Sequence, residues 1–83
     1  MWAGVASTGE RYEFYYLSGG RLRYTKNGTP YEGDKWSQSG DAVMMDMTQG
    51  YAIYRGTIKG DRIDFTATNK VGASWTVPVV KMR

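Results

Sequence analysis

Apolar and polar residues alternate with a period of two along most of the chain. In the segment 62–69, Ile63, Phe65 and Ala67 alternate with an aspartate and two threonines. This alternation is typical of a β-strand with one buried face. Every stretch long enough for a helix is interrupted by glycine or lacks apolar spacings of three and four, so the sequence predicts no significant helix.

Turn sequences containing glycine interrupt the alternation at roughly ten-residue intervals, a spacing typical of all-β proteins. These turns are Ser18-Gly19-Gly20, Asn27 to Gly33, Ser39-Gly40-Asp41, Gln49-Gly50, Lys59-Gly60-Asp61 and Asn69 to Gly72. The seven strands predicted between them are Arg11–Leu17, Arg21–Lys26, Lys35–Ser39, Ala42–Thr48, Tyr51–Ile58, Arg62–Asn69 and Ala73–Val80. An eighth strand is expected if Trp2–Ala6 pairs with a neighbour.

The alternation also predicts which side chains face the core. The large inward residues are Tyr12, Phe14, Tyr16, Leu22, Tyr24, Trp36, Val43, Met45, Met47, Tyr54, Ile58, Ile63, Phe65, Trp75, Val77 and Val79. Gly56 is expected to relieve crowding or to bend its strand. Pro78 has no amide to donate, so the last strand is expected at a sheet edge or a bulge.

Short turns between consecutive strands predict an antiparallel up-and-down meander of about seven strands. A chain of 83 residues forms a single domain, here residues 1–83. No helix is available to cover the apolar face of such a sheet. The sheet is therefore expected either to curl into a small barrel or cup, or to pair with a second copy as a homodimer.

Composition narrows the possible chemistry. The 7 Tyr, 3 Trp and 5 Met supply much of the apolar volume, and the net charge is only +3. The chain has no Cys and no His, which excludes thiolate nucleophiles and removes the commonest general base and metal ligand. The aspartates at 41, 46, 61 and 64 divide between turns and the outward face. The sequence therefore predicts no enzyme activity, no cofactor and no metal site.

The first eleven residues carry no basic region and no continuous apolar stretch. The sequence therefore predicts neither a signal peptide nor a membrane span. A cytoplasmic chain and an exported mature form both fit this pattern.

Three segments carry a resemblance to a known group of domains. The runs Lys35–Asp41, Tyr51–Asp61 and Ser74–Thr76 contain a Trp strand, a Gly-Asp turn, a Tyr-x-x-Tyr-x-Gly-x-Ile strand and a late Trp. This order resembles the small bacterial lipocalin-like β-meander domains, over about Tyr12 to Val80. The resemblance implies a meander fold, and the wider lipocalin-like class binds small apolar molecules within the barrel.

The first functional hypothesis is a non-catalytic binding module for a small apolar or aromatic ligand. Large inward residues with a polar group are typical of a ligand pocket. The residues predicted to line it are Tyr16, Tyr24, Trp36, Tyr54 and Trp75. The same side chains would instead form a filled core if the barrel is narrow, since eight strands are often just wide enough for side chains alone.

Two further hypotheses concern the outward face. Met44, Tyr15, Leu17 and Ile53 would form an apolar patch for a homodimer or another protein partner. The third hypothesis, binding of single-stranded nucleic acid, rests on Arg21, Arg23, Lys26, Arg55, Lys59 and Arg62 near Tyr15, Tyr24 and Tyr51. It is the least favoured of the three because acidic residues interleave with these cations.

Overall fold

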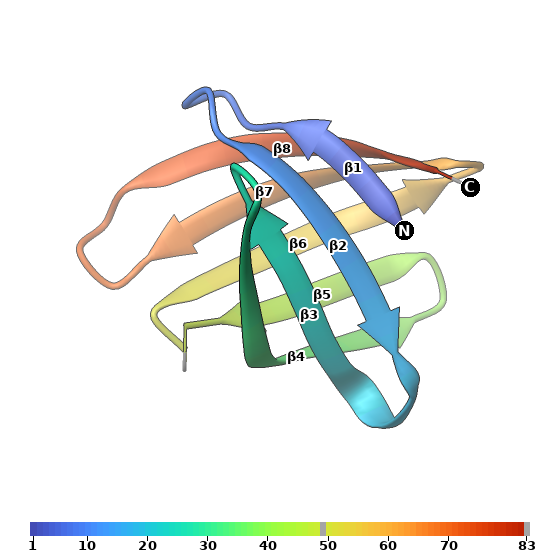
Figure 1. Cartoon of the computed structure of the whole chain (residues 1–83). Helices are drawn as coiled ribbons and strands as arrows, with labels where there is room; N and C mark the ends of the chain where they lie inside the picture. Colours follow the sequence, from blue (N-terminus) through green and yellow to red (C-terminus); the bar gives the residue numbers. More distant parts are fainter. Residues whose placement is uncertain (49, 83) are drawn as a thin grey trace.

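The chain forms one closed β-barrel (Figure 1). The computed structural model describes residues 1–48 and 50–82, and over these residues eight antiparallel strands pair in sequence order, with the last returning to the first. They are β1 (Trp2–Val5), β2 (Arg11–Leu17), β3 (Arg21–Lys26), β4 (Thr29–Ser39), β5 (Ala42–Met47), β6 (Ala52–Lys59), β7 (Arg62–Asn69) and β8 (Ser74–Lys81). A 3-10 turn, η1 (Ser18–Gly20), joins β2 to β3. The predicted all-β meander is confirmed.

Most strand bounds agree with the sequence prediction. β2, β3 and β7 have the predicted bounds, and β5, β6 and β8 differ from them by one residue at one or both ends. The eighth strand, expected if Trp2–Ala6 pairs with a neighbour, forms as β1 and pairs with β2. The barrel therefore has eight strands, one more than the seven predicted without this condition. The predicted turn at Gln49-Gly50 includes Gln49, which lies outside the described residues.

The first half of β4 was not predicted. Pro30 and Gly33 indicated a long turn, but the turn is confined to Asn27-Gly28, and Thr29 already pairs with Lys26. Asn27 and Gly28 have φ angles of 51° and 84°, the left-handed conformation that this hairpin turn requires. The register between β3 and β4 then shifts between Leu22 and Tyr24, so a β-bulge accommodates Gly33, whereas Pro30 lies in the regular ladder opposite Thr25.

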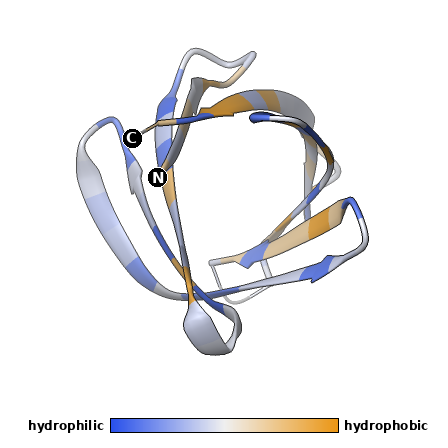
Figure 2. Ribbon diagram, turned by 90° about the vertical axis from the view of Figure 1, so that its right-hand side faces the viewer, coloured by the Kyte–Doolittle hydropathy of each residue, from blue (hydrophilic) through white to orange (hydrophobic). Residues whose placement is uncertain are grey.

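Side chains from the inward face of every strand fill the middle of the barrel, and Figure 2 shows the strands arranged as a ring around this interior. Phe14, Met45, Phe65 and Val77 are all fully buried there. The Phe14 ring meets those of Tyr54 and Phe65 edge to face, with centroids 6.2 Å and 6.1 Å away. The predicted inward residues are confirmed as core residues or as half-buried residues packed against the core.

Gly56 lies where β6 passes close to β7. A Cβ at this position would lie 2.8 Å from the backbone oxygen of Asp64 and 2.8 Å from side-chain atoms of Ile63 and Phe65. The predicted role of Gly56 in relieving crowding is therefore confirmed.

The seam between β1 and β8 closes the barrel with a short ladder. Within residues 1–48 and 50–82, two register pairs join these strands, Trp2 with Lys81 and Ala3 with Val80. β8 also pairs with β7, so it is not the edge strand that Pro78 suggested. Pro78 instead lies just beyond the short ladder, where its missing amide leaves no seam hydrogen bond unmade.

Candidate functional site

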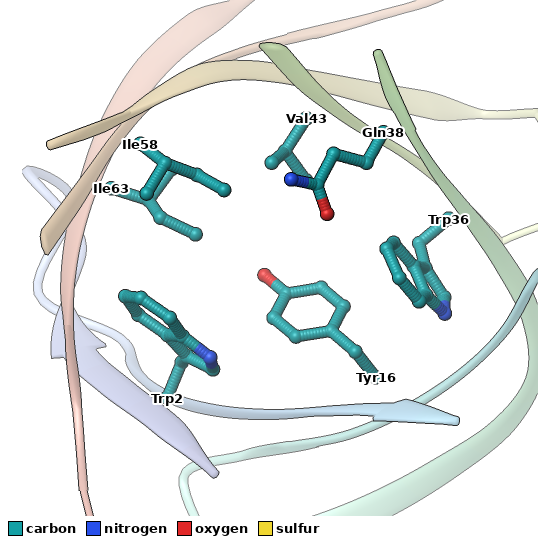
Figure 3. A pocket seen from close by; sticks show the side chains of 7 residues that line it. All are labelled: Trp2, Tyr16, Trp36, Gln38, Val43, Ile58 and Ile63. Atoms are coloured by element: carbon teal, nitrogen blue, oxygen red, sulfur yellow. The ribbon is translucent and has the colours of Figure 1, made fainter. Parts of the chain in front are cut away.

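A pocket opens at one end of the barrel interior. Its volume is about 200 Å³. We call it the mouth pocket, and its lining residues are Trp2, Tyr16, Trp36, Gln38, Val43, Ile58 and Ile63. Figure 3 shows these side chains surrounding the pocket, with the Tyr16 hydroxyl and the Gln38 amide pointing into it.

The meander brings these residues together because alternate turns of an up-and-down barrel lie at the same end. Tyr16 lies just before the β2–β3 turn, and Val43 just after the β4–β5 turn. Ile58 and Ile63 are register partners beside the β6–β7 turn. Trp2 joins them from the start of β1, opposite Lys81 at the end of β8.

Trp36 forms one fixed wall of the mouth pocket. Its indole Nε1–H donates a 2.9 Å hydrogen bond to the backbone oxygen of Leu17. Its ring meets that of Tyr16 edge to face, with centroids 5.1 Å apart and planes at 61°. These contacts connect β4 to the end of β2 and fix the orientation of the indole beside the pocket.

Tyr16 contributes a hydroxyl to an otherwise largely apolar surface. The hydroxyl donates to the sulfur of Met45, at 3.5 Å. Burial raises the pKa of Tyr16 well above its usual range, so this hydroxyl stays protonated at neutral pH. It is therefore a neutral donor inside the mouth pocket.

The opposite end of the interior is closed by aromatic side chains. The Trp75 indole donates a 3.2 Å hydrogen bond to the Tyr54 hydroxyl, and the two rings meet edge to face at 5.8 Å. The Tyr12 ring packs against both Tyr24 and Tyr54. Tyr24 in turn stacks on Tyr31, with centroids 5.0 Å apart. The Tyr54 hydroxyl thus has a hydrogen-bond partner inside the core, and the other rings pack against one another.

The five predicted pocket residues thus divide between the two ends of the barrel. The structure brings Tyr16 and Trp36 together in the mouth pocket. It places Tyr24, Tyr54 and Trp75 on the other side of Phe14, among the aromatic side chains that close the opposite end. The interior therefore combines a filled core with a pocket at one end.

Trp2 and Gln38 were not among the predicted pocket residues. Alternation distinguishes the inner face from the outer face but does not give the height of a residue along the barrel axis. The distance of each inward residue from the nearest turn carries that information. Counting from alternate turns would have grouped Tyr16, Val43, Ile58 and Ile63 at one end of the barrel.

Raising the pH above about 10 is expected to lower the free energy of unfolding, because Tyr54 is 1% exposed and burial raises its pKa above its ordinary value of 10.0. The Tyr54 hydroxyl therefore loses its proton at a lower pH in the unfolded chain than in the folded chain. Its contribution to the free energy of unfolding is complete below pH 10 and decreases by about 1.4 kcal/mol per pH unit above it. Denaturant titrations across this range measure the slope. Tyr54→Phe should reduce the slope and exposed Tyr51→Phe should not; an unchanged slope in Tyr54→Phe would contradict this.

Two carboxylates lie near the bulge of β4, outside the mouth pocket. Buried Asp34 accepts a 2.8 Å hydrogen bond from the backbone amide of Thr48 and so ties β4 to the segment after β5. One oxygen of Asp46 is buried and has no hydrogen-bond partner within residues 1–48 and 50–82. In the same part of the chain, no group of three acidic side chains is placed to hold a metal ion.

No family model, curated protein or solved structure matches this chain. Inferences about its function therefore rest on the geometry inside its eight-stranded antiparallel barrel. Among the helical residues that the structure describes, no segment has the length and apolar character needed to cross a membrane.

The outward face divides the apolar residues that suggested a protein interface. Tyr15 and Leu17 lie on β2, whereas Met44 and Ile53 lie on β5 and β6, with β3 and β4 between the two pairs. Met44 is 40% exposed and the other three are half-buried. The four side chains therefore do not form one continuous patch.

Two of the outward cations have partners on the outer surface of the barrel. The Arg23 guanidinium lies 4.8 Å from the centroid of the Tyr15 ring, and Arg62 forms a 2.9 Å ion pair with Asp64. Tyr24 is buried in the barrel interior, so it is not available to stack on a base. The nucleic-acid hypothesis therefore loses Tyr24, one of its three tyrosines, as a residue that could stack on a base.

Proposed function

We propose that this chain is a non-catalytic binding protein that holds a small apolar or aromatic molecule in the mouth pocket. The supporting observation is a concave site of about 200 Å³ with indole rings on two sides and isoleucines on a third. Ligand pockets are typically apolar with a few polar groups that fix orientation. Among the described residues, the lining consists of aromatic and aliphatic side chains and one glutamine.

The volume favours a compact ligand. Pockets for drug-sized molecules occupy about 300–1,000 Å³, whereas an apolar cavity of about 150 Å³ in another protein takes up benzene. A volume of about 200 Å³ suits a planar group of one or two rings. A longer molecule would insert such a group and extend out of the barrel end.

The resemblance to small bacterial lipocalin-like β-meander domains supports the same proposal, since the wider class uses the barrel interior for apolar molecules. The segments that carry the resemblance include Trp36, which lines the mouth pocket, and the Tyr51–Asp61 run, which contributes Ile58. Lipocalin-like character is therefore part of the proposed function.

A homodimeric interaction module is the alternative proposal. The sequence favoured it because the apolar face of an open sheet needs a cover. In the closed barrel that face is buried within a single chain. A second copy is no longer needed to cover it, so the ligand-binding proposal takes precedence.

Native mass spectrometry of freshly expressed protein tests the proposal and the alternative together. A discrete added mass that is lost on denaturation supports ligand binding, and its identification gives the ligand. A mass of two bare chains supports the homodimer. Isopropylbenzene serves as a defined apolar probe if the protein emerges without a ligand, and it is expected to shift the indole N–H resonances in NMR titrations.

Replacing Ile58 by phenylalanine is expected to weaken binding of isopropylbenzene by about 5- to 150-fold, because the added ring occupies the pocket and fitting the probe beside it overpacks the site by about 1–3 kcal/mol. Ile53→Phe is the matched control. Ile53 lies on the same strand but faces outward, opposite Asp46 on β5. The proposal fails if both variants bind the probe as the natural chain does.

A further inference from the structure

The Tyr16 hydroxyl makes a weak hydrogen bond for a group held inside a protein. Among residues 1–48 and 50–82, its partner is the Met45 thioether, at 3.5 Å. A thioether sulfur is a poor acceptor compared with a carbonyl or ring nitrogen. In Figure 3 the hydroxyl points into the mouth pocket. The hydroxyl can therefore exchange a weak partner for a stronger one supplied by a ligand.

The indole of Trp2 is a second available donor. The Trp36 and Trp75 indoles donate to the Leu17 carbonyl and the Tyr54 hydroxyl. Within the part of the chain that the structure describes, the half-buried Trp2 indole has no such acceptor. Two of the aromatic groups that line the mouth pocket thus offer hydrogen-bond donors.

Gln38 lies at the exposed side of the pocket and complements these donors. Its amide Nε2 donates a 3.0 Å hydrogen bond to the backbone oxygen of Gly40. That bond uses one of the two amide N–H donors, and the amide oxygen, which points into the pocket in Figure 3, is the acceptor that the rim offers to a ligand. The inner surface therefore offers donors, and the rim offers an acceptor.

No charged side chain lines the mouth pocket among the described residues. Enclosing a carboxylate, phosphate or ammonium without a partner would carry a large desolvation cost. The part of the ligand that enters is therefore uncharged.

We infer that the ligand is an uncharged planar aromatic molecule carrying a carbonyl or ring-nitrogen acceptor, which receives the hydrogen bond of Tyr16. This inference rests on the proposed function of the mouth pocket. The two indoles select a flat ring, the volume limits its size, and the Tyr16 hydroxyl fixes its orientation.

Three probes of similar size test this inference on the natural chain. Acetophenone carries a carbonyl acceptor, isopropylbenzene has the same number of non-hydrogen atoms and the same branching without an acceptor, and benzoate carries a charge. Calorimetric titration is expected to show that acetophenone binds about three- to tenfold more tightly than isopropylbenzene, as one net hydrogen bond allows. Benzoate is expected to bind more weakly than both.

Tyr16→Phe removes only the hydroxyl and is expected to abolish the preference for acetophenone while leaving isopropylbenzene binding within about twofold. Tyr15→Phe makes the same change on the adjacent, outward residue and is expected to keep the preference. Equal affinities of the natural chain for acetophenone and isopropylbenzene would overturn the inference while leaving the proposed function standing. Tighter binding of benzoate would also overturn it. Failure of all three probes to bind would refute both the proposed ligand-binding function and the inference about the chemistry of the ligand.

Discussion

Replacing Phe14 by alanine is expected to lower the free energy of unfolding by about 3–5 kcal/mol. Phe14 is 0% exposed, and five aromatic rings lie with their centroids 5.5 to 6.4 Å from its own. Truncation removes buried apolar surface and leaves a cavity whose walls belong to different strands of a closed barrel. Such walls cannot move together without disturbing the strand ladders, so little of the cavity closes.

Denaturant unfolding measures this loss, and two variants serve as controls. Phe14→Leu keeps most of the volume and is expected to cost less than Phe14→Ala. Tyr15→Ala truncates the adjacent ring on the outward side, where part of the lost surface already faces solvent. A loss below about 1 kcal/mol for Phe14→Ala would mean that the centre of the barrel is not close-packed.

Replacing Gly4 by alanine is expected to cost up to about 3 kcal/mol, a large effect for the addition of one methyl group. A Cβ at Gly4 would overlap the backbone oxygen of Pro78 and would lie 2.9 Å from its carbonyl carbon and 3.1 Å from Cα of Val79. All three atoms belong to the β8 backbone, which cannot rotate away as a side chain can. The methyl group must therefore push β1 away from β8 at the seam.

Thermal unfolding and amide hydrogen exchange report this change. Gly4→Ala is expected to lower the melting temperature and to speed exchange of the Met82 amide, which donates a 2.7 Å hydrogen bond to Met1. Val5→Ala is the control on the same strand, because Val5 is 56% exposed and its truncation should change the stability by less than about 0.5 kcal/mol. Equal melting temperatures for Gly4→Ala and the natural chain would contradict a tight seam.

Local patterns predicted most of the fold because each hairpin is a local structure. The alternation of Ile63, Phe65 and Ala67 marks a buried face that the barrel keeps, and Asn27-Gly28 forms the tight turn that its residue types favour. The start of β4 escaped prediction because a bulge tolerates Gly33 and because Pro30, a residue that usually marks a turn, lies in the ladder opposite Thr25. Whether Trp2 would pair could not be read locally, since one partner of β1 lies at the other end of the sequence.

The candidate site was only partly predictable for a related reason. Residue type and alternation identified Tyr16 and Trp36, but they gave equal support to Tyr54 and Trp75 at the other end of the interior. Separating the two ends requires the register of the hairpins and the stagger of the strands around the barrel. Gln38 was missed because it is a polar residue at the rim, outside any pattern of buried positions.

The short seam between β1 and β8 also bears on the order of folding. Every other strand pair follows a local hairpin, whereas the seam must bring together residues separated by almost the whole chain, at a cost in loop entropy that its two register pairs barely reward. Closure is therefore expected to be the last step of assembly. Trp2 takes its place in the mouth pocket only when the seam closes. A molecule bound there would therefore stabilise the closed barrel relative to forms in which the seam is open.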